Sequence, residues 1–480
     1  MILDDTIAAI ATPLGEGGLA VVRVSGAQAF AVADTSFLPS GKNSLKPSVA
    51  PTHTIQYGKI TRGGEVIDEV LLAVFRAPRT FTREDTVEVS CHGGILSAKL
   101  VLDTLLENGA RLAEPGEFTR RAFLNGRIDL AQAEAVADLI HSRTELALAA
   151  ANEQLAGKLS QRINRLRDDL MHALAHVEAH IDFPDEDIAP DTKAQLLKRL
   201  ESGIVFMDEL LRTANEGQIL RRGIRAAIVG RPNVGKSSLL NQLLGRDRAI
   251  VSPIAGTTRD TIEETANIRG LPVVFIDTAG LREARDEIEQ EGIRRSRESL
   301  ANAEFILHVL DASEPLAKED ENYLAEFAGK KRILVRNKVD MPAKWDFEEL
   351  KCHVGVQASA CSPDKLKLEL QQDTPPPKVD VSCVSGQGIE ALKDAIKQLA
   401  WSGEIKAEML QVMINSRHQD ALNRARSATQ RTIEALGGGA TLELAAMDLR
   451  IAVNAVGEIV GKTATEDLLD SIFSQFCIGK

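Results

Sequence analysis

The segment GRPNVGKS, residues 230–237, indicates the architecture of the central part of this chain. It follows the apolar run at 226–229 and precedes an apolar-periodic segment, which is the strand, loop and helix order of a phosphate-binding loop. Its glycines let backbone N–H groups close on phosphates, Lys236 can reach the β- and γ-phosphates, and the Ser237 hydroxyl can ligate Mg²⁺. The stretch therefore predicts a nucleotide site in an α/β domain.

Two segments after this loop can sense a γ-phosphate. In GTTRD, residues 256–260, Thr258 is placed to sense it through Mg²⁺. The apolar run VVFI ends in DTAG, residues 277–280, where the Asp277 carboxylate can hold the Mg²⁺ shell and the Gly280 amide can sense the γ-phosphate. The pair predicts a nucleotide-dependent switch.

Two later segments point to guanine. ILVRNKVD closes a buried strand, and Asp340 can accept both hydrogen bonds from the guanine N1–H and exocyclic amine, which adenine cannot supply. Lys338 can lie along the base, and Asn337 can tie this loop to the phosphate-binding loop. VDVSCVSG places Ser382 and Cys383 near the guanine carbonyl. The nucleotide is therefore predicted to be GTP.

These segments are expected to meet, because open parallel sheets bind ligands at the carboxyl ends of their strands. Their order along the chain predicts one composite site that holds GTP with Mg²⁺. The predicted GTP-binding residues are Asn233, Val234, Gly235, Lys236, Ser237, Ser238, Ser252, Pro253, Ile254, Ala255, Gly256, Thr257, Thr258, Asp277, Thr278, Ala279, Gly280, Asn337, Lys338, Asp340, Ser382 and Cys383.

The usual water-positioning group of Ras-like proteins is missing. Those proteins carry a glutamine directly after the DTAG glycine, whereas this chain carries Leu281. Asn233 offers a side-chain oxygen beside the phosphates, and the segment 252–257 can wrap over them with carbonyls and hydroxyls. A monovalent cation fits such an oxygen-lined nest and can do the electrostatic work of an arginine finger. The alternative is that Asn233 only shapes a turn.

Composition limits the class of protein. A length of 480 residues suggests about three domains, and a net charge of −12 argues against a generally basic surface, so an RNA contact should be a local patch or be shared with a partner. The five cysteines show no paired metal-ligand spacing, which, without a signal peptide, fits a reducing cytosol. Because no apolar stretch is long enough to span a bilayer, we expect a cytoplasmic protein without a membrane contact.

The hydrophobic pattern changes along the chain. Residues 1–120 alternate short apolar runs with turns before one helix-like segment, which predicts an α+β domain. Apolar residues at helical spacing dominate 121–222 and return over 401–480, which predicts a discontinuous all-α helical domain. We therefore predict a multidomain chain in which an α/β Ras-like P-loop GTPase domain, residues 223–400, is inserted into the helical domain.

Segments outside the nucleotide motifs are more distinctive. They are DTIAAIATPLGEGGLAVVRVSG near the start, PGEFTRRAFLNGRIDLAQAEAVADLI, AHIDFPDED, and the terminal FCIGK. With the nucleotide motifs, they make the chain resemble the MnmE (TrmE) family of tRNA-modification GTPases along nearly its whole length. General GTPases share the nucleotide motifs but not the start, the PGEF segment or the tail, so the combination is highly specific.

The resemblance implies that the N-terminal domain binds 5-formyl- or methylene-tetrahydrofolate. Its pocket would map to Arg23, Glu88 and Arg127, with Lys480 approaching from the chain end. Many relatives carry Lys at the Arg127 position, and Arg keeps the charge but changes its shape. Cys477 would be the functionally important tail cysteine of the family. From its position alone, a nucleophile or redox group and a buried structural residue both remain open.

The resemblance also implies metal ligands and a catalytic residue in the GTPase domain. The implied K⁺ ligands are Asn233, Ser252, Thr257 and the backbone carbonyl of Ile254. Mg²⁺ would be held at Ser237 and Thr258. Glu289 matches the residue that orients the attacking water through a bridging water, whereas the pattern around it alone favours a solvated helix carboxylate.

The activity that the resemblance implies is a K⁺-activated GTPase that adds a (carboxymethyl)aminomethyl group at C5 of the wobble uridine of certain tRNAs. It would use methylene-tetrahydrofolate as the one-carbon donor. It would work as a homodimer and form a heterotetramer with a partner of the MnmG (GidA) type that carries FAD. Two alternatives remain open: a regulatory GTPase for ribosome assembly with RNA-binding flanking domains, and a scaffold with a vestigial GTPase. Folate binding would argue against the assembly factor, and GTP turnover against the scaffold.

Overall fold

The computed structural model describes residues 5–182, 190–245, 264–276, 302–347, 375–401, 413–438 and 441–480. The chain forms two compact units, each assembled from separate stretches of sequence. Unit 1 consists of Met1–Ala137, Glu153–Leu211 and Arg417–Lys480. Unit 2 consists of Asp138–Asn152 and Arg212–Ser416.

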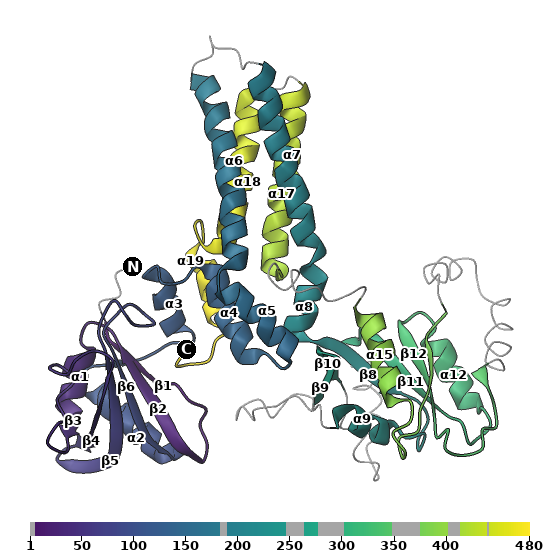
Figure 1. Cartoon of the computed structure of the whole chain (residues 1–480), viewed down its shortest axis with the longest axis horizontal. Helices are drawn as coiled ribbons and strands as arrows, with labels where there is room; N and C mark the ends of the chain where they lie inside the picture. The colour runs from purple at the N-terminus through teal and green to yellow at the C-terminus, as the bar shows by residue number, and fades with distance from the viewer. Residues whose placement is uncertain are drawn as a thin grey trace. The chain divides into compact units, whose positions relative to one another are not determined.

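Unit 1 begins with a seven-stranded sheet in the order β3-β4-β5-β6-β2-β1-β7. Its strands are β1 (Ile7–Ile10), β2 (Gly17–Ser25), β3 (Phe37–Pro39), β4 (Thr54–Arg62), β5 (Glu65–Phe75), β6 (Thr86–Gly93) and β7 (Arg111–Leu112). Neighbours pair antiparallel, except for the parallel pair β1 and β7. The helices α1 (Ala29–Ser36) and α2 (Ile95–Glu107) complete the core on one face of this sheet (Figure 1).

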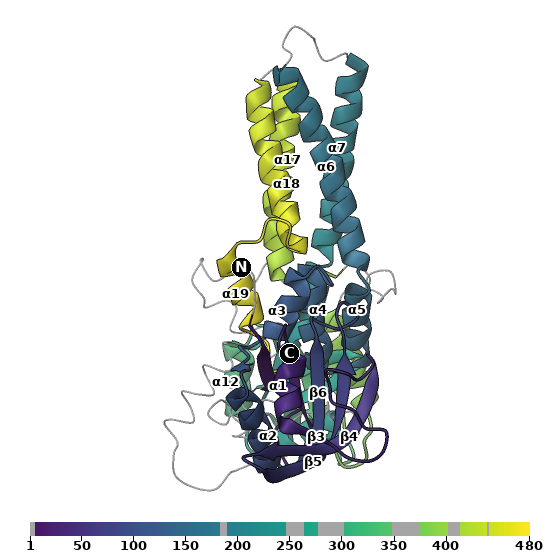
Figure 2. The same ribbon diagram turned by 90° about the vertical axis from the view of Figure 1, so that its left-hand side faces the viewer.

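The remaining elements that contribute to unit 1 are helical. They are α3 (Glu117–Leu124), α4 (Leu130–His141), α6 (Lys158–Asp182), α7 (Pro190–Arg212), α17 (Ser416–Gly438), α18 (Leu442–Val460) and α19 (Glu466–Phe473). The end of α5 (Glu145–Leu155) also belongs to unit 1, whereas most of that helix belongs to unit 2. Figures 1 and 2 show α6, α7, α17 and α18 side by side as a bundle. Ion pairs tie Arg450 to Glu178 at 2.7 Å and Arg426 to Asp208 at 2.6 Å. Segments on either side of unit 2 in the sequence therefore form one bundle.

A buried charge cluster joins α4 to the start of α17. A carboxylate oxygen of Glu134 lies 2.8 Å from the Arg417 guanidinium and 2.8 Å from Nε2 of the fully buried His418. Burial acts to raise the pKa of Glu134, but the charges and hydrogen bonds of His418 and Arg417 outweigh it and hold that pKa well below its ordinary value. Arg417 also donates to the carbonyl oxygens of Glu458 and Ile459, so the cluster fixes the end of α18 as well.

Unit 2 contains a six-stranded sheet in the order β13-β12-β11-β8-β10-β9. Its strands are β8 (Ile224–Val229), β9 (Glu264–Ile268), β10 (Leu271–Phe275), β11 (Phe305–Asp311), β12 (Arg332–Asn337) and β13 (Lys378–Asp380). All pairs are parallel except β9 with β10. After β8, the next two strands, β9 and β10, lie on one side of it, and the later strands β11, β12 and β13 lie on its other side. The carboxyl end of β8 is therefore a topological switch point, where such sheets bind ligands.

Helices α9 (Lys236–Leu244), α12 (Lys318–Glu326) and α15 (Ile389–Ala400) accompany this sheet. A separate apolar cluster lies at its β10 side, where α5 and α8 (Ala214–Arg222) pack against the sheet. The buried members of this cluster are Ala147, Leu220, Leu271, Trp401 and Met413. Arg143, just before α5, also donates a hydrogen bond to Thr265 on β9. The α5 segment is thus part of the unit that holds the phosphate-binding loop.

The predicted fold class is confirmed: an α+β N-terminal part, a helical part and a P-loop α/β part. The helical pattern from Leu130 onward is divided into α4, α5 and α6, and Gly157 ends α5 with a left-handed φ of 82°. The three-domain division at 1–120, 121–222 with 401–480, and 223–400 stays a prediction. Within the described residues, no helix has the length and apolar character that crossing a membrane requires.

Candidate functional site

The phosphate-binding loop joins β8 to α9 at the carboxyl edge of the unit 2 sheet. Gly230 has no room for a side chain, because a Cβ there would lie 2.3 Å from the Val309 carbonyl oxygen. Gly235 has a left-handed φ of 97°, and a Cβ there would lie 2.2 Å from Nδ2 of Asn337. The loop therefore packs tightly against β11 and β12. Its backbone N–H groups lead into the N-terminus of α9, which favours an anion.

The ammonium of Lys236 lies inside this loop. Its Nζ donates to the carbonyl oxygens of Gly230 at 2.8 Å and Arg231 at 2.7 Å. Burial lowers the pKa of Lys236 from its ordinary value, and a partly desolvated cation attracts a phosphate more strongly than one in bulk water. Asn233 has a φ of 63°, a conformation that asparagine adopts more readily than most residues. This geometry fits the turn-shaping role, and a ligand role for its side chain stays a prediction.

The predicted guanine loops follow β12 and β13, which are neighbours in the sheet. Asn337 Nδ2 donates to the Val234 carbonyl at 2.8 Å, and Asn337 Oδ1 accepts from the Cys383 N–H at 3.3 Å. The predicted hydrogen bond between this loop and the phosphate-binding loop is therefore present, and it extends to the Ser382–Cys383 loop. Asp340 is exposed beside this junction. Burial raises the pKa of the Cys383 thiol to about 11, so it is a neutral thiol at neutral pH.

Sequence reasoning missed Asp311, the last residue of β11. Its carboxylate lies 2.5 Å from Nζ of Lys338, and Trp345 Nε1 donates to its backbone carbonyl at 2.7 Å. Burial acts to raise the pKa of Asp311, but hydrogen bonds from Lys338 and Ser313 outweigh it and lower that pKa. Asp311 therefore holds Lys338, whose φ is 65°, against the guanine loop. The available signal was a carboxylate at the end of the buried strand FILHVLD.

A second cluster forms in unit 1, where the tail after α19 reaches the N-terminal sheet. Arg23 on β2 faces Glu88 on β6, and its Nε donates to Glu88 Oε1 at 2.7 Å. Arg23 also donates to the Gly479 carbonyl at 3.5 Å. An antiparallel bridge between Pro115 and Ile478 fixes the tail further. The structure thus brings together Arg23, Glu88 and the segment that carries Lys480.

Aromatic rings lie beside both predicted folate arginines. The Arg23 guanidinium is 5.6 Å from the centre of the Phe118 ring, and that of Arg127 is 6.0 Å from the centre of the Phe81 ring. Phe81 and Phe118 pack in the same apolar cluster. Arg127 is exposed, and within the described residues no direct contact joins it to Arg23. The two arginines therefore border one aromatic cluster without touching each other.

Comparison with known families covers both units. The model of the GTP-binding protein TrmE N-terminus matches residues 6–127, and the model of the MnmE helical domain matches residues 130–477. The second match spans more than half of the chain. The chain belongs to the MnmE family. The resemblance stated from the sequence segments is thereby confirmed.

Individual relatives support the same assignment over the full length. The tRNA modification GTPase MnmE of Listeria innocua is 47% identical over 477 residues, which are 99% of this chain and 99% of the relative. The protein of that name from Geobacillus kaustophilus is 47% identical over 480 residues, with coverage of 99% of both chains. Among solved structures, the G domain of the T. maritima FeoB iron transporter covers 37% of this chain and 99% of its own, at 27% identity and a TM-score of 0.26.

Part of the predicted MnmE-type GTPase site lies outside the described residues. These positions are Ser252, Pro253, Ile254, Ala255, Gly256, Thr257, Thr258, Asp277, Thr278, Ala279, Gly280 and Glu289. Of the predicted K⁺ ligands, the described residues include Asn233, and of the predicted Mg²⁺ ligands they include Ser237. Metal binding and the role of Glu289 therefore stay predictions for this MnmE-family chain.

The tail cysteine is exposed, so the alternative that Cys477 is a buried structural residue is wrong. The Cys477 carbonyl accepts hydrogen bonds from the N–H groups of Gly116 at 3.4 Å and Lys480 at 3.3 Å. The backbone of this MnmE-family tail is thus held to unit 1, while the residue itself remains accessible. That arrangement is compatible with a reactive role.

Proposed function

We propose that this chain is a K⁺-activated GTPase that adds a (carboxymethyl)aminomethyl group at C5 of the wobble uridine of certain tRNAs. It would act with an FAD-dependent partner of the MnmG (GidA) type and use methylene-tetrahydrofolate as the one-carbon donor. Membership of the MnmE family supports GTP hydrolysis and a role in tRNA modification. Activation by potassium, the partner protein and the folate chemistry go further than these two activities.

The observation that carries the GTPase part is the position of Asn337. Its side chain hydrogen-bonds both the phosphate-binding loop and the Ser382–Cys383 loop, so the two ends of a bound nucleotide would be read by one connected structure. Lys236 would bind the β- and γ-phosphates, and Asp340 would accept the guanine donors. Ser237, at the start of α9, would hold Mg²⁺, which offsets the charge that develops on the phosphates.

GTP hydrolysis should be much faster in K⁺ than in Na⁺. No water-positioning glutamine follows the DTAG glycine, and a cation in the proposed oxygen-lined nest would stabilise the charge of the transition state. An arginine finger raises turnover by about 10³-fold or more in other GTPases. Because the bound cation would take over that electrostatic role, we expect turnover in K⁺ to be at least about tenfold higher than turnover in Na⁺. Turnover of the full chain at matched ionic strength measures this. Equal rates in the two salts would remove the cation nest from the mechanism.

The surroundings of Arg23 support a folate-type ligand. Arg23 and Glu88 supply a cation and a carboxylate that are 20% and 29% exposed. The partly buried Phe81, in the same apolar cluster as the fully buried Phe118, supplies an aromatic ring beside Arg127. A pterin can pair with a carboxylate, and the anionic glutamate tail of a folate suits Arg127 and Lys480. The support is chemical: a cation and a carboxylate lie beside the docked tail, and an aromatic ring lies beside Arg127.

Cys477→Ser should abolish formation of the modified uridine and leave K⁺-stimulated GTP turnover unchanged. The thiol is exposed on a tail that is anchored beside Arg23, whereas the phosphate-binding loop belongs to unit 2. Nucleoside analysis of tRNA from a deletion strain that carries the variant measures modification, and the purified variant gives turnover. Ile478→Ala, next along the same exposed tail, is the matched control and should keep both activities. Loss of both activities in Cys477→Ser would point to a structural role instead.

An exposed apolar face of the N-terminal sheet supports the homodimer. Tyr57 on β4 pairs in register with Leu71 on β5, and both are about half exposed, at 47% and 45%. Ile55, two residues before Tyr57 and therefore on the same face, is 67% exposed. A second copy of the chain with the same face would cover these side chains by an isologous contact. The partner of the MnmG type and the tRNA would bind elsewhere on the dimer.

A further inference from the structure

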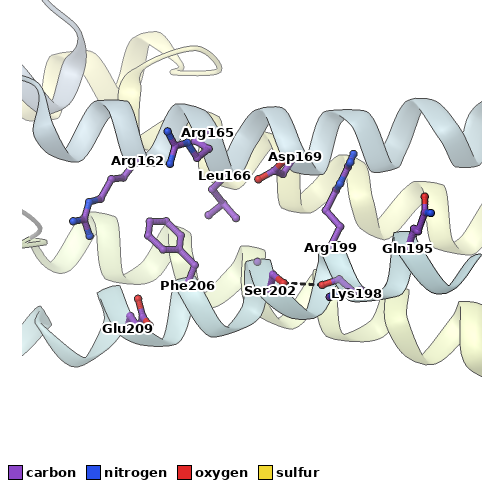
Figure 3. Close-up of a pocket in the computed structure, with 11 residues that line it drawn as sticks. Arg162, Arg165, Leu166, Asp169, Gln195, Lys198, Arg199, Ser202, Phe206 and Glu209 are labelled. Atoms are coloured by element: carbon purple, nitrogen blue, oxygen red, sulfur yellow. Dashed lines mark hydrogen bonds between the residues drawn. The ribbon is translucent and has the colours of Figure 1, made fainter. Parts of the chain in front are cut away.

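A groove between α6 and α7 carries cations that neither the GTPase site nor the folate site uses. Its volume is about 760 Å³. Figure 3 shows Arg162 and Arg165 from α6 on one side and Lys198 and Arg199 from α7 on the other. Both helices belong to unit 1 over these positions. The groove is therefore a single local feature of the helical bundle.

The helical spacing of the sequence produces this lining. Arg162 and Arg165 are three residues apart, so they lie on the same face of α6, with the buried Leu166 beside them. On α7, Lys198 and Arg199 are exposed, and the buried Gly203 follows one turn later. A Cβ at Gly203 would lie 3.4 Å from Leu166 Cδ1, so the glycine leaves space between the helices that a larger residue would fill. The groove therefore has an apolar floor at Leu166 and Gly203. Its basic rim is formed by Arg162, Arg165, Lys198 and Arg199.

The charge of the groove is positive. The rim contributes four cations, whereas its carboxylates are Asp169 and Glu209. Within the described parts of the chain, none of the four cations forms an ion pair or a side-chain hydrogen bond. The first ten residues of α6, from Lys158, contain four basic residues and no acidic one. In a chain of net charge −12, such a cluster is a distinct positive patch.

We propose that this groove binds the sugar–phosphate backbone of the tRNA substrate, which rests on the proposed function. Guanidinium groups bind phosphate oxygens through two parallel hydrogen bonds, and cations on two helices can contact successive phosphates. The half-buried ring of Phe206, between Arg162 and Ser202 in Figure 3, offers an apolar surface for a ribose or an unstacked base. The rim cations are exposed rather than enclosed, which suits a polymer that passes through better than a small nucleotide, whose surface a pocket would mostly bury.

Arg165→Gln combined with Arg199→Gln tests the proposal. The affinity of the full chain for a labelled tRNA should fall at least about tenfold near 0.1 M salt, because each phosphate contact contributes through counterion release. The slope of log K against log salt should fall in magnitude by roughly 1.5 for two lost contacts. The matched control is Lys42→Gln combined with Lys462→Gln, which removes the same charge from exposed positions outside the groove and should stay within about twofold of the unaltered chain.

Several outcomes separate the possibilities. Unchanged tRNA affinity in the groove variant would overturn the proposal that the groove binds tRNA, and so would an equal loss of tRNA affinity in the control. Neither result would affect the proposed function. Normal tRNA affinity with loss of binding to the FAD-dependent protein would make the groove a protein-docking surface and also overturn it. If the unaltered chain binds no tRNA with or without that partner, the proposed function fails together with the groove. Because the groove lies in unit 1 and the GTP site in unit 2, far-UV circular dichroism and thermal unfolding of each variant report correct folding of the bundle. Arg165→Lys with Arg199→Lys should retain most of the salt slope.

Discussion

Asp340→Asn is expected to convert this GTPase into an enzyme that prefers xanthosine triphosphate. A carboxylate at this position accepts hydrogen bonds from the guanine N1–H and exocyclic amine, whereas an asparagine would direct its own amide donors at one of them. Sites built around a specific hydrogen bond discriminate by about 10⁴-fold or more when it is lost, so we expect GTP affinity to fall by at least about 10³-fold. Xanthine carries a carbonyl in place of the amine and would restore the pairing.

Nucleotide affinities and turnover with both triphosphates measure this effect. Asp394→Asn is the matched control, since Asp394 is an exposed aspartate of the same unit that pairs with Arg269 on the surface. That variant should keep the preference for GTP and lose at most about 1 kcal/mol of stability. If Asp340→Asn keeps GTP specificity, the assignment of Asp340 to the base is wrong, and the Asn337 hydrogen bonds serve another purpose.

Glu134→Gln is expected to destabilise the helical part of unit 1 by about 3–5 kcal/mol, because it leaves the fully buried His418 and the partly buried Arg417 without their carboxylate. The amide exchange of α17 should accelerate accordingly, since this cluster fixes the start of that helix. Hydrogen-exchange protection measures the change in opening free energy directly. Glu178→Gln, which removes a more exposed pair with Arg450, is the control and should cost about 1 kcal/mol or less.

The same cluster predicts a pH dependence. The pKa of Glu134 is lower in the folded chain than its ordinary value of 4.5, so the unfolded chain binds the proton more readily. The stabilisation is therefore fully present above about pH 4.5 and is lost as the pH falls through the folded-state pKa. In Glu134→Gln this part of the acid sensitivity of α17 protection should disappear. A variant with the same acid profile as the unaltered chain would contradict the role of Glu134.

The phosphate-binding loop and the guanine loops were predictable because local sequence dictates them. Gly230 and Gly235 stand where a Cβ would collide with neighbouring strands, and the apolar runs around them form parallel strands with a shared carboxyl edge. The hydrogen bond from Asn337 to Val234 follows from that shared edge. Asp311 was missed because its importance depends on β11 lying next to β12, which strand order decides and periodicity does not.

The helical segments were harder to assign. The helical periodicity of residues 130–155 is the same whichever neighbour covers the apolar side, so it could not show that Ala147 packs with Leu271 of the unit 2 sheet. The position of the tail came from family resemblance rather than from pattern, since the bridge from Ile478 to Pro115 links positions far apart in the sequence. Likewise, the basic start of α6 is visible in the sequence, but the groove depends on how α7 packs beside it.

The apolar cluster around α5 and α8 decides where the nucleotide-binding unit can be cut from the rest of the chain. Leu271 and Trp401 are 0% and 3% exposed, and their cover comes partly from Ala147 and Leu220. A recombinant fragment limited to residues 223–400 would lack Trp401 and would expose Leu271 to solvent. The exposed apolar surface would favour aggregation. A soluble autonomous piece needs the α5 segment supplied as well, by a tether or a circular permutation, because that segment comes from a stretch of sequence separate from the rest of unit 2.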